Sequence, residues 1–164
     1  MNKIKIMSKI YYHGTNKEFD KFENKDGTAK ISTIFGSEIV DRVGFFFSKE
    51  KEFAAEFGSN LTKWELNIKN TLDLTSSFND DEVMSQFIED GWSEKRLINI
   101  YPGNIWELMD GENGPDFLST LEKYGYDSIK MLEADNKGVL QEAVVVFDAD
   151  KIKKNKKKKK HLII

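Results

Sequence analysis

The segment at residues 140–147, with the sequence Leu-Gln-Glu-Ala-Val-Val-Val-Phe, constrains the fold more than any other part of the chain. Its β-branched and aromatic residues predict a strand, and a turn-rich stretch precedes it. Because alternate side chains of a strand share a face, Glu142 points the same way as Leu140, Val144 and Val146. A carboxylate on an apolar face is costly unless it is paired or lines a cleft. Glu142 is therefore either a functional carboxylate in a cleft or a strand-end residue that reaches solvent.

A second unusual segment lies near the start of the chain, where a short apolar strand at residues 9–13 ends in His13-Gly14-Thr15. The only other histidine, His161, lies in a lysine-rich tail, so His13 is the one histidine expected within the fold. Glycine permits either a tight turn or the close approach of a ligand to the backbone. A lone histidine at a strand end is otherwise a hydrogen-bonded structural residue, and both interpretations stay open.

Aromatic residues form a third cluster. Phe45, Phe46 and Phe47 are consecutive, and the helix expected next places Phe53 and Phe57 four residues apart on one side. Core packing accounts for Phe45, Phe47 and Phe53. For Phe46 and Phe57, a stacking platform for a flat heterocycle competes with core packing, because aromatic faces do both.

Composition restricts the class of protein. A chain of 164 residues that is 39% hydrophobic suits one globular domain, and the lack of cysteine excludes disulfides, cysteine catalysis and cysteine zinc sites. No apolar run has membrane-spanning length and no signal-peptide core is present, so we expect a cytoplasmic protein. Residues 151–160 hold eight lysines and no acid, which leaves 17 basic and 28 acidic residues in residues 1–150, a net charge of −11. We expect a single domain at residues 1–153 and a basic, disordered tail at residues 154–164.

The pattern of strands and helices favours an α+β fold, with strands at both ends and helices between them. Residues 23–43 have weak periodicity and many polar residues, so we expect a long loop there. The expected strands are residues 9–13, 44–48, 61–68, 128–132 and 140–147, and the expected helices are residues 49–57, 80–89, 93–99 and 115–124.

In chain order, these segments resemble the ADP-ribosyltransferase family, specifically its His-Tyr-Glu branch of diphtheria-toxin-like enzymes and poly(ADP-ribose) polymerases. The first family strand ends in His-Gly-Ser/Thr, which His13-Gly14-Thr15 matches. The second carries Gly-x-Tyr-Phe and a further Tyr eleven residues on, matched by residues 44–47 and Phe57. The last strand opens with the catalytic Glu and is followed by Asp, as in residues 141–148.

The ending Val-Phe-Asp-x-x-x-Ile-Lys at residues 146–153 is similar to that of small ADP-ribosyltransferase domains of phages and mobile elements, often found in polyvalent proteins. Residues 61–74 and 124–129 also resemble these domains, so the resemblance spans residues 9–153. It implies a split β-sheet core with flanking helices and an NAD cleft. It also implies a mono-ADP-ribosyltransferase, a glycosyltransferase of the pentosyl-transferring kind, that modifies a host macromolecule in the bacterial cytoplasm.

The resemblance assigns Glu142 as the catalytic residue, and no metal is required. NAD is the expected substrate, and the acceptor is a host protein or, alternatively, a nucleic acid. The residues expected to bind NAD are His13, Gly14, Thr15, Phe46, Ser48 and Phe57.

Several positions depart from the family pattern. Both stacking tyrosines are replaced, by Phe46 and Phe57, and Ala54 stands where the polymerases have a serine that binds the nicotinamide amide. Leu140 stands where arginine-modifying toxins have a second acid, which counts against an arginine acceptor. There are therefore two alternatives. One is a catalytically degenerate module that binds NAD or a partner, and the other is an NAD glycohydrolase.

Overall fold

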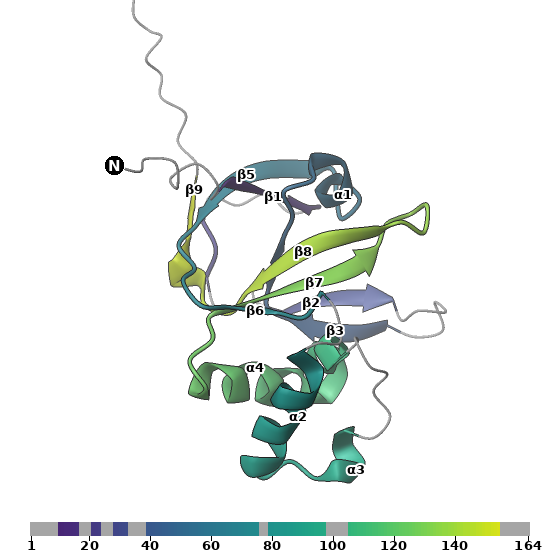
Figure 1. Cartoon of the computed structure of the whole chain (residues 1–164). Coiled ribbons are helices and arrows are strands. Elements are labelled where there is room, and N and C mark those ends of the chain that lie inside the picture. The colour runs from purple at the N-terminus through teal and green to yellow at the C-terminus, as the bar shows by residue number, and fades with distance from the viewer. Residues whose placement is uncertain are drawn as a thin grey trace, which may run out of the picture.

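The computed structural model describes residues 10–16, 21–23, 28–32, 39–75, 79–97 and 105–154. Two β-sheets and a separate hairpin form the framework (Figure 1). Helices α2 (Asp80–Glu89), α3 (Glu94–Leu97) and α4 (Gly114–Lys123) lie on one side of the larger sheet, whereas α1 (Lys51–Ala55) lies beside the smaller sheet. Helices and mainly antiparallel strands combine in an α+β fold, as the sequence predicts.

The smaller sheet has three strands: β1 (Ile10–Thr15), β5 (Asn60–Leu66) and β9 (Ile152–Lys154). β5 lies in the middle and pairs antiparallel with both neighbours. Trp64 and Leu66 of β5 are buried, whereas Glu65 between them is exposed. This alternation gives the sheet one apolar face, which lies against the rest of the domain.

The larger sheet has the strand order β4-β8-β7-β6. β8 pairs antiparallel with β4 and with β7, whereas β6 and β7 are parallel. Consecutive β-branched residues make β8 suitable for a central position that is buried on both faces. The four strands are β4 (Phe45–Phe47), β6 (Thr71–Asp73), β7 (Ser128–Ala134) and β8 (Leu140–Val146).

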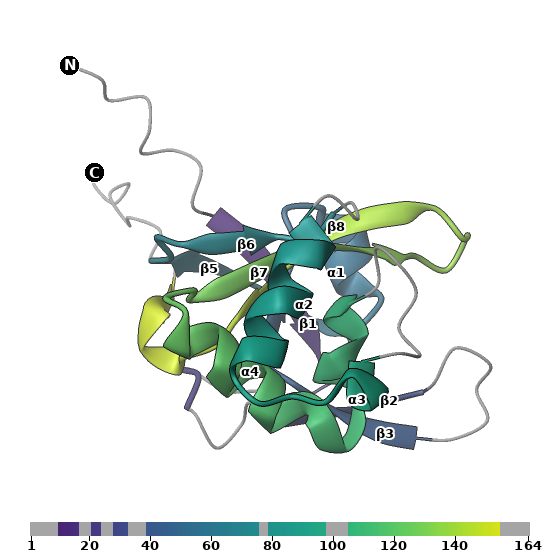
Figure 2. The ribbon, with the colours of Figure 1, turned by 60° about the horizontal axis from the view of Figure 1, so that its bottom comes forward.

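Two hydrophobic clusters lie on opposite faces of the larger sheet. Ala143 and Val145 of β8 contribute to the cluster under the helices, while Val144 and Val146 contribute to the cluster between the two sheets. The predicted alternation of side chains along this strand is therefore confirmed. Figure 2 shows α2 and α4 lying across the helical side of the larger sheet. The α-helices are α1 (Lys51–Ala55), α2 (Asp80–Glu89), α3 (Glu94–Leu97) and α4 (Gly114–Lys123).

A short backbone bridge joins the two sheets. The amide of Tyr12 donates to the carbonyl of Ser48 at 2.8 Å, and the amide of Ser48 donates to the carbonyl of Tyr12 at 3.0 Å. This pairing places the end of β4 beside β1, close to His13. The joint therefore brings together the two segments in which the sequence predicts binding residues.

Residues 23–43 are not a continuous loop, because β2 (Thr28–Ser32) and β3 (Ile39–Val43) form an antiparallel hairpin within them. Three short 3-10 helices, η4 (Ile105–Met109), η5 (Gly111–Asn113) and η6 (Ala149–Lys151), also lie outside the expected elements. No helix of the described part of the chain is long and apolar enough to cross a bilayer.

The first lysines of the lysine-rich segment belong to regular secondary structure. Lys151 belongs to η6, and β9 continues to Lys154, one residue past the predicted domain boundary. Ile152 is 8% exposed and contributes to the core between the sheets, which fixes this segment to β5. Residues 155–164, the rest of the predicted tail, lie outside the described residues.

Candidate functional site

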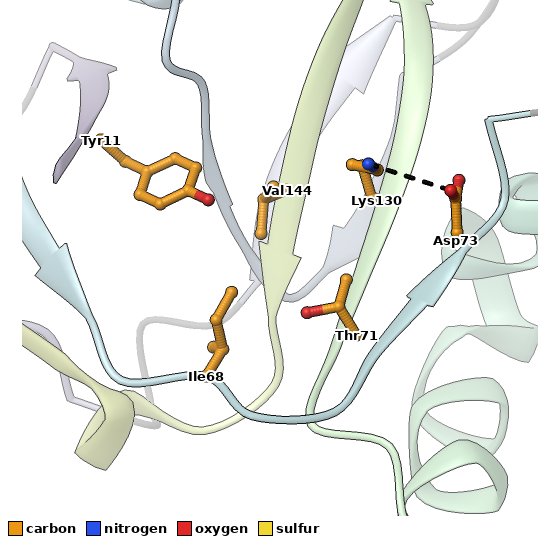
Figure 3. Close-up of a pocket in the computed structure, with 6 residues that line it drawn as sticks. All are labelled: Tyr11, Ile68, Thr71, Asp73, Lys130 and Val144. Carbon is orange, nitrogen blue, oxygen red and sulfur yellow. Dashed lines mark ion pairs between the residues drawn. The ribbon is translucent and has the colours of Figure 1, made fainter. Parts of the chain in front are cut away.

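A groove between the two sheets holds the candidate site. It contains a cavity of about 590 Å³ beside Glu142 and a second of about 340 Å³ that adjoins it, and the two share Tyr11, Lys130 and Val144. Figure 3 shows the second cavity, with Tyr11 reaching from β1 toward Val144 on β8. The larger cavity is also lined by Ser48, Lys49, Glu50, Leu132, Leu140, Gln141 and Glu142.

Glu142 lies near the exposed end of β8, directly across the ladder from Leu132 on β7. Its side chain is exposed, in contrast to Val144 and Val146, which are buried on the same face. The carboxylate thus lines a groove and also reaches solvent. Both positions that the sequence left open for Glu142, in a cleft and in contact with solvent, therefore apply. Glu142 is not an uncompensated buried charge, because the cluster between the two sheets includes Val144 and Val146 of β8 but does not extend to Glu142.

Ser48 connects the backbone of Glu142 to the start of the next segment. Its side chain is 2% exposed, and its Oγ donates to the carbonyl oxygen of Glu142 at 3.1 Å. The same Oγ accepts a hydrogen bond from the amide of Glu50 at 3.0 Å. Ser48 therefore fixes the strand end that carries Glu142, in addition to lining the cavity.

His13 faces the space between the sheets. Its Nδ1 lies 2.7 Å from the carbonyl oxygen of Phe46, and its ring contacts Phe22 and Phe47, with centroids 4.9 and 5.3 Å away. Because a carbonyl only accepts, Nδ1 carries the proton and Nε2 is the acceptor of the neutral ring. Burial lowers the pKa of His13, and the bond to Phe46 offsets only part of that shift.

Gly14 is buried where β1 meets α1. A Cβ at this position would overlap the carbonyl oxygen of Ala54, so glycine is needed for strand and helix to approach. The close approach expected for a ligand at Gly14 is thus made, on this side of the strand, by the protein itself. Thr15 ends β1 with a half-buried side chain.

Phe46 and Phe57 have different surroundings. Phe46 pairs with Val145 across the ladder and lies against the helical core, on the opposite face of the sheet from Glu142. Phe57 is 44% exposed just after α1 and contacts Phe53, with ring centroids 5.3 Å apart. The structure therefore does not place Phe46 on the face of the groove, whereas the Phe57 ring is accessible.

Tyr11 and Lys49 belong to the groove but were not among the predicted site residues. Tyr11 shares a face with His13 two residues along β1, and the Nζ of Lys49 lies 5.4 Å from the centroid of its ring. Burial, and then the negative charge of Glu142, raise the pKa of Tyr11. The period-two pattern of the strand is the signal that could have identified Tyr11.

A buried ionic network lies behind the groove, on the helical face. Arg42 is 5% exposed and binds Asp110 through Nε and Nη2 at 2.6 and 3.0 Å, and Glu133 through Nη1 at 2.8 Å. Its guanidinium also lies over Phe46, 4.9 Å from the ring centroid. The bidentate contact favours the charged form, so the pKa of Arg42 is raised despite burial. Arg42 is one of only two arginines in a lysine-rich sequence. Because arginine is preferred to lysine in buried ion pairs, its presence could have indicated such a pair.

Three comparisons relate this chain to known proteins. A family model described as "ADP-Ribosyltransferase in polyvalent proteins" matches residues 7–161. A region of an alanine–tRNA ligase of Staphylococcus saprophyticus subsp. saprophyticus is 34% identical over 110 residues. That match covers 64% of this chain but only 12% of the ligase. A crystal structure of an anti-CRISPR protein superposes with a TM-score of 0.49 and 18% identity, over 89% of this chain and 94% of that one.

Proposed function

Since the chain belongs to the ADP-ribosyltransferase family of polyvalent proteins, we propose that it is an NAD-dependent mono-ADP-ribosyltransferase of the His-Tyr-Glu type. The observation that carries this proposal is the position of Glu142. It is an exposed carboxylate that lines a groove between the sheets, held at its backbone by Ser48. A carboxylate in such a place can reach the ribose of a bound dinucleotide and a nucleophile arriving from solvent.

The proposed reaction breaks the bond between C1′ of the ribose and the nicotinamide nitrogen. The bonding electron pair leaves with nicotinamide, and positive charge develops on C1′ and the ring oxygen, as in other glycosyl transfers. Glu142 stabilises this charge and accepts a hydrogen bond from a ribose hydroxyl. The acceptor then forms a new bond to C1′, and Glu142 takes the proton that the acceptor loses.

The remaining predicted residues support NAD binding in this proposal. His13, whose ring is oriented by the carbonyl oxygen of Phe46, contacts a hydroxyl of the adenosine ribose. The accessible ring of Phe57 stacks on nicotinamide, while the backbone of Gly14 and Thr15 binds the carboxamide side. Phe46 acts through its carbonyl oxygen, which orients His13, since its own ring lies on the other face of the sheet.

The direct test is incubation of the protein with NAD labelled in the adenylate part, together with bacterial lysates, followed by identification of the labelled product. We propose that the gene derives from a phage or mobile element and that the acceptor is a host macromolecule in the bacterial cytoplasm, with a protein preferred to a nucleic acid. Label that resists protease but not nuclease would assign the acceptor to nucleic acid instead.

Loss of both tyrosine hydroxyls favours a second candidate, because Phe46 and Phe57 provide no polar group to orient NAD for transfer. In that case the protein hydrolyses NAD, with water as the acceptor, or only binds it. Release of free nicotinamide without any labelled acceptor would identify the glycohydrolase. Binding without nicotinamide release would identify the degenerate module.

A further inference from the structure

Lys49 is a cation at the edge of the groove that the proposed reaction does not yet use. It lies between β4 and α1, lines the same cavity as Glu142, and holds its Nζ over the ring of Tyr11 at 5.4 Å. Within the described part of the chain, no carboxylate forms an ion pair with this Nζ. Its charge is therefore available to a ligand.

Tyr11 provides a hydroxyl at the same place. Its half-buried ring lies between the two cavities, and Figure 3 shows the hydroxyl directed into the groove, toward β8. A tyrosine with its ordinary pKa of 10.0 is protonated at neutral pH, and burial and the negative charge of Glu142 raise the pKa of Tyr11 further. The Tyr11 hydroxyl can thus donate a hydrogen bond to an oxygen of a ligand.

Lys130 is the other cation of the groove, but its charge is partly offset. Its Nζ lies 3.8 Å from the carboxylate of Asp73, on the neighbouring strand. Glu50 and Glu142 add negative charge to the larger cavity, and the body of the protein is acidic as a whole. An anionic ligand that enters beside Glu142 therefore depends most strongly on Lys49.

NAD is such a ligand, because its diphosphate carries negative charge between the two riboses. We propose that Lys49 and Tyr11 together bind this diphosphate, with the Lys49 ammonium supplying the charge and the Tyr11 hydroxyl a hydrogen bond. The inference rests on the proposed use of NAD. Anchoring the diphosphate next to Glu142 would offset the repulsion between two negative groups and present the nicotinamide ribose to the carboxylate.

The test measures binding of ADP-ribose by calorimetry, because this probe carries the diphosphate but no reactive nicotinamide bond. The proteins are the unaltered chain, Lys49→Gln, Tyr11→Phe and the control Lys51→Gln. Lys51 is an exposed lysine two residues away that does not line either cavity. Lys51→Gln changes the net charge by the same amount as Lys49→Gln, so it controls for charge alone. We expect Lys49→Gln to weaken ADP-ribose binding about three- to tenfold and Tyr11→Phe about threefold. Lys51→Gln should bind like the unaltered chain.

A second readout separates binding from chemistry. Lys49→Gln should raise KM for NAD while kcat stays close to that of the unaltered chain, and its affinity should depend less on salt. Equal affinities of Lys49→Gln and Lys51→Gln for ADP-ribose would overturn the inference and leave the proposed function intact. So would a fall in kcat without a change in affinity, since Lys49 would then act on Glu142. If the unaltered chain binds neither ADP-ribose nor NAD, the proposed function and this inference are overturned together.

Discussion

The imidazole of His13 is bonded to the backbone of Phe46 across the joint between the two sheets, with Nδ1 2.7 Å from the carbonyl oxygen. One side chain therefore links the strand that ends in His-Gly-Thr to the strand of consecutive phenylalanines. The bond requires only the Nδ1 proton, and burial disfavours a second proton on the ring. His13 is thus held neutral and in one tautomer.

This relationship predicts a loss of stability in mild acid. The pKa of His13 is lowered in the folded state from its ordinary value of 6.5, so the unfolded chain binds the proton first as the pH falls. The contribution of His13 to the free energy of unfolding should be constant above pH 6.5 and should decrease between pH 6.5 and the lower folded pKa. His13→Asn should lose this part of the pH dependence. Urea unfolding of both proteins over this pH range measures it, and identical slopes would contradict the prediction.

Glu142→Gln should separate catalysis from stability. Since the Glu142 side chain is exposed, the substitution should change the free energy of unfolding by less than about 0.5 kcal/mol. ADP-ribosyl transfer should fall by about 100-fold or more, because charge stabilisation and proton removal both need the carboxylate. The control is Glu65→Gln, at an exposed position on the outer face of β5. Transfer by Glu142→Gln at the rate of the unaltered chain would show that Glu142 is a surface residue only.

Phe57→Ala should weaken NAD binding by about 1–3 kcal/mol if the ring stacks on nicotinamide. The side chain is 44% exposed and contacts Phe53 at one edge, so its loss should leave the core intact. Ile88→Ala is the matched control, since Ile88 is 42% exposed and lies on α2, which packs against the opposite face of the larger sheet from Glu142. Calorimetry with NAD tests the prediction. Equal affinities of the two variants would exclude a stacking role for Phe57.

Arg42→Met should be strongly destabilising. The substitution removes the partner of Asp110 and Glu133 and leaves two carboxylates in a largely buried site. The expected cost is about 3–5 kcal/mol in the free energy of unfolding, measured by urea denaturation. Arg42→Lys should cost less, because it keeps the positive charge. It should still be destabilising, because lysine cannot make the bidentate contact with Asp110. A loss below about 1 kcal/mol for Arg42→Met would show that the network contributes little.

Two shortened chains should distinguish the last strand from the lysine-rich end. A chain ending at Lys154 keeps β9, and we expect it to retain its fold and its affinity for NAD. A chain ending at Lys151 loses the pairing with β5 and the buried side chain of Ile152. It should lose about 2–4 kcal/mol of stability, mostly from the apolar contact. Thermal melts of both chains test this, and equal melting temperatures would show that β9 is dispensable.

Local sequence was sufficient for the strands that carry the site. The β-branched run of β8 and the apolar start of β1 both form strands within a few residues of the expected bounds, as the strand propensity of their residues predicts. α2 matches its expected range, and Gly91 and Gly125 follow α2 and α4 with φ of 100° and 94°. These features depend on neighbours close in sequence.

What local sequence did not reveal depends on partners far along the chain. β6 and β9 are three residues long, and β9 lies among lysines that resemble a solvated tail. The hairpin of β2 and β3 has no clear apolar alternation to mark it. The alternation along β4 indicates that Phe46 faces away from its neighbours, but which face borders the groove is decided by β1 and β8. Likewise, the exposure of Glu142 depends on how far the smaller sheet extends over β8.

The register of β5 has a consequence for how this domain connects to other sequence. Ile10 and Lys153 lie on either side of Glu65, one at the start of β1 and the other within β9. Two strand spacings separate such positions, a distance of about 10 Å. The polypeptide therefore enters and leaves the described domain at neighbouring points on one sheet. A domain with adjacent entry and exit points can be inserted into a longer protein while its own strand pairing stays intact.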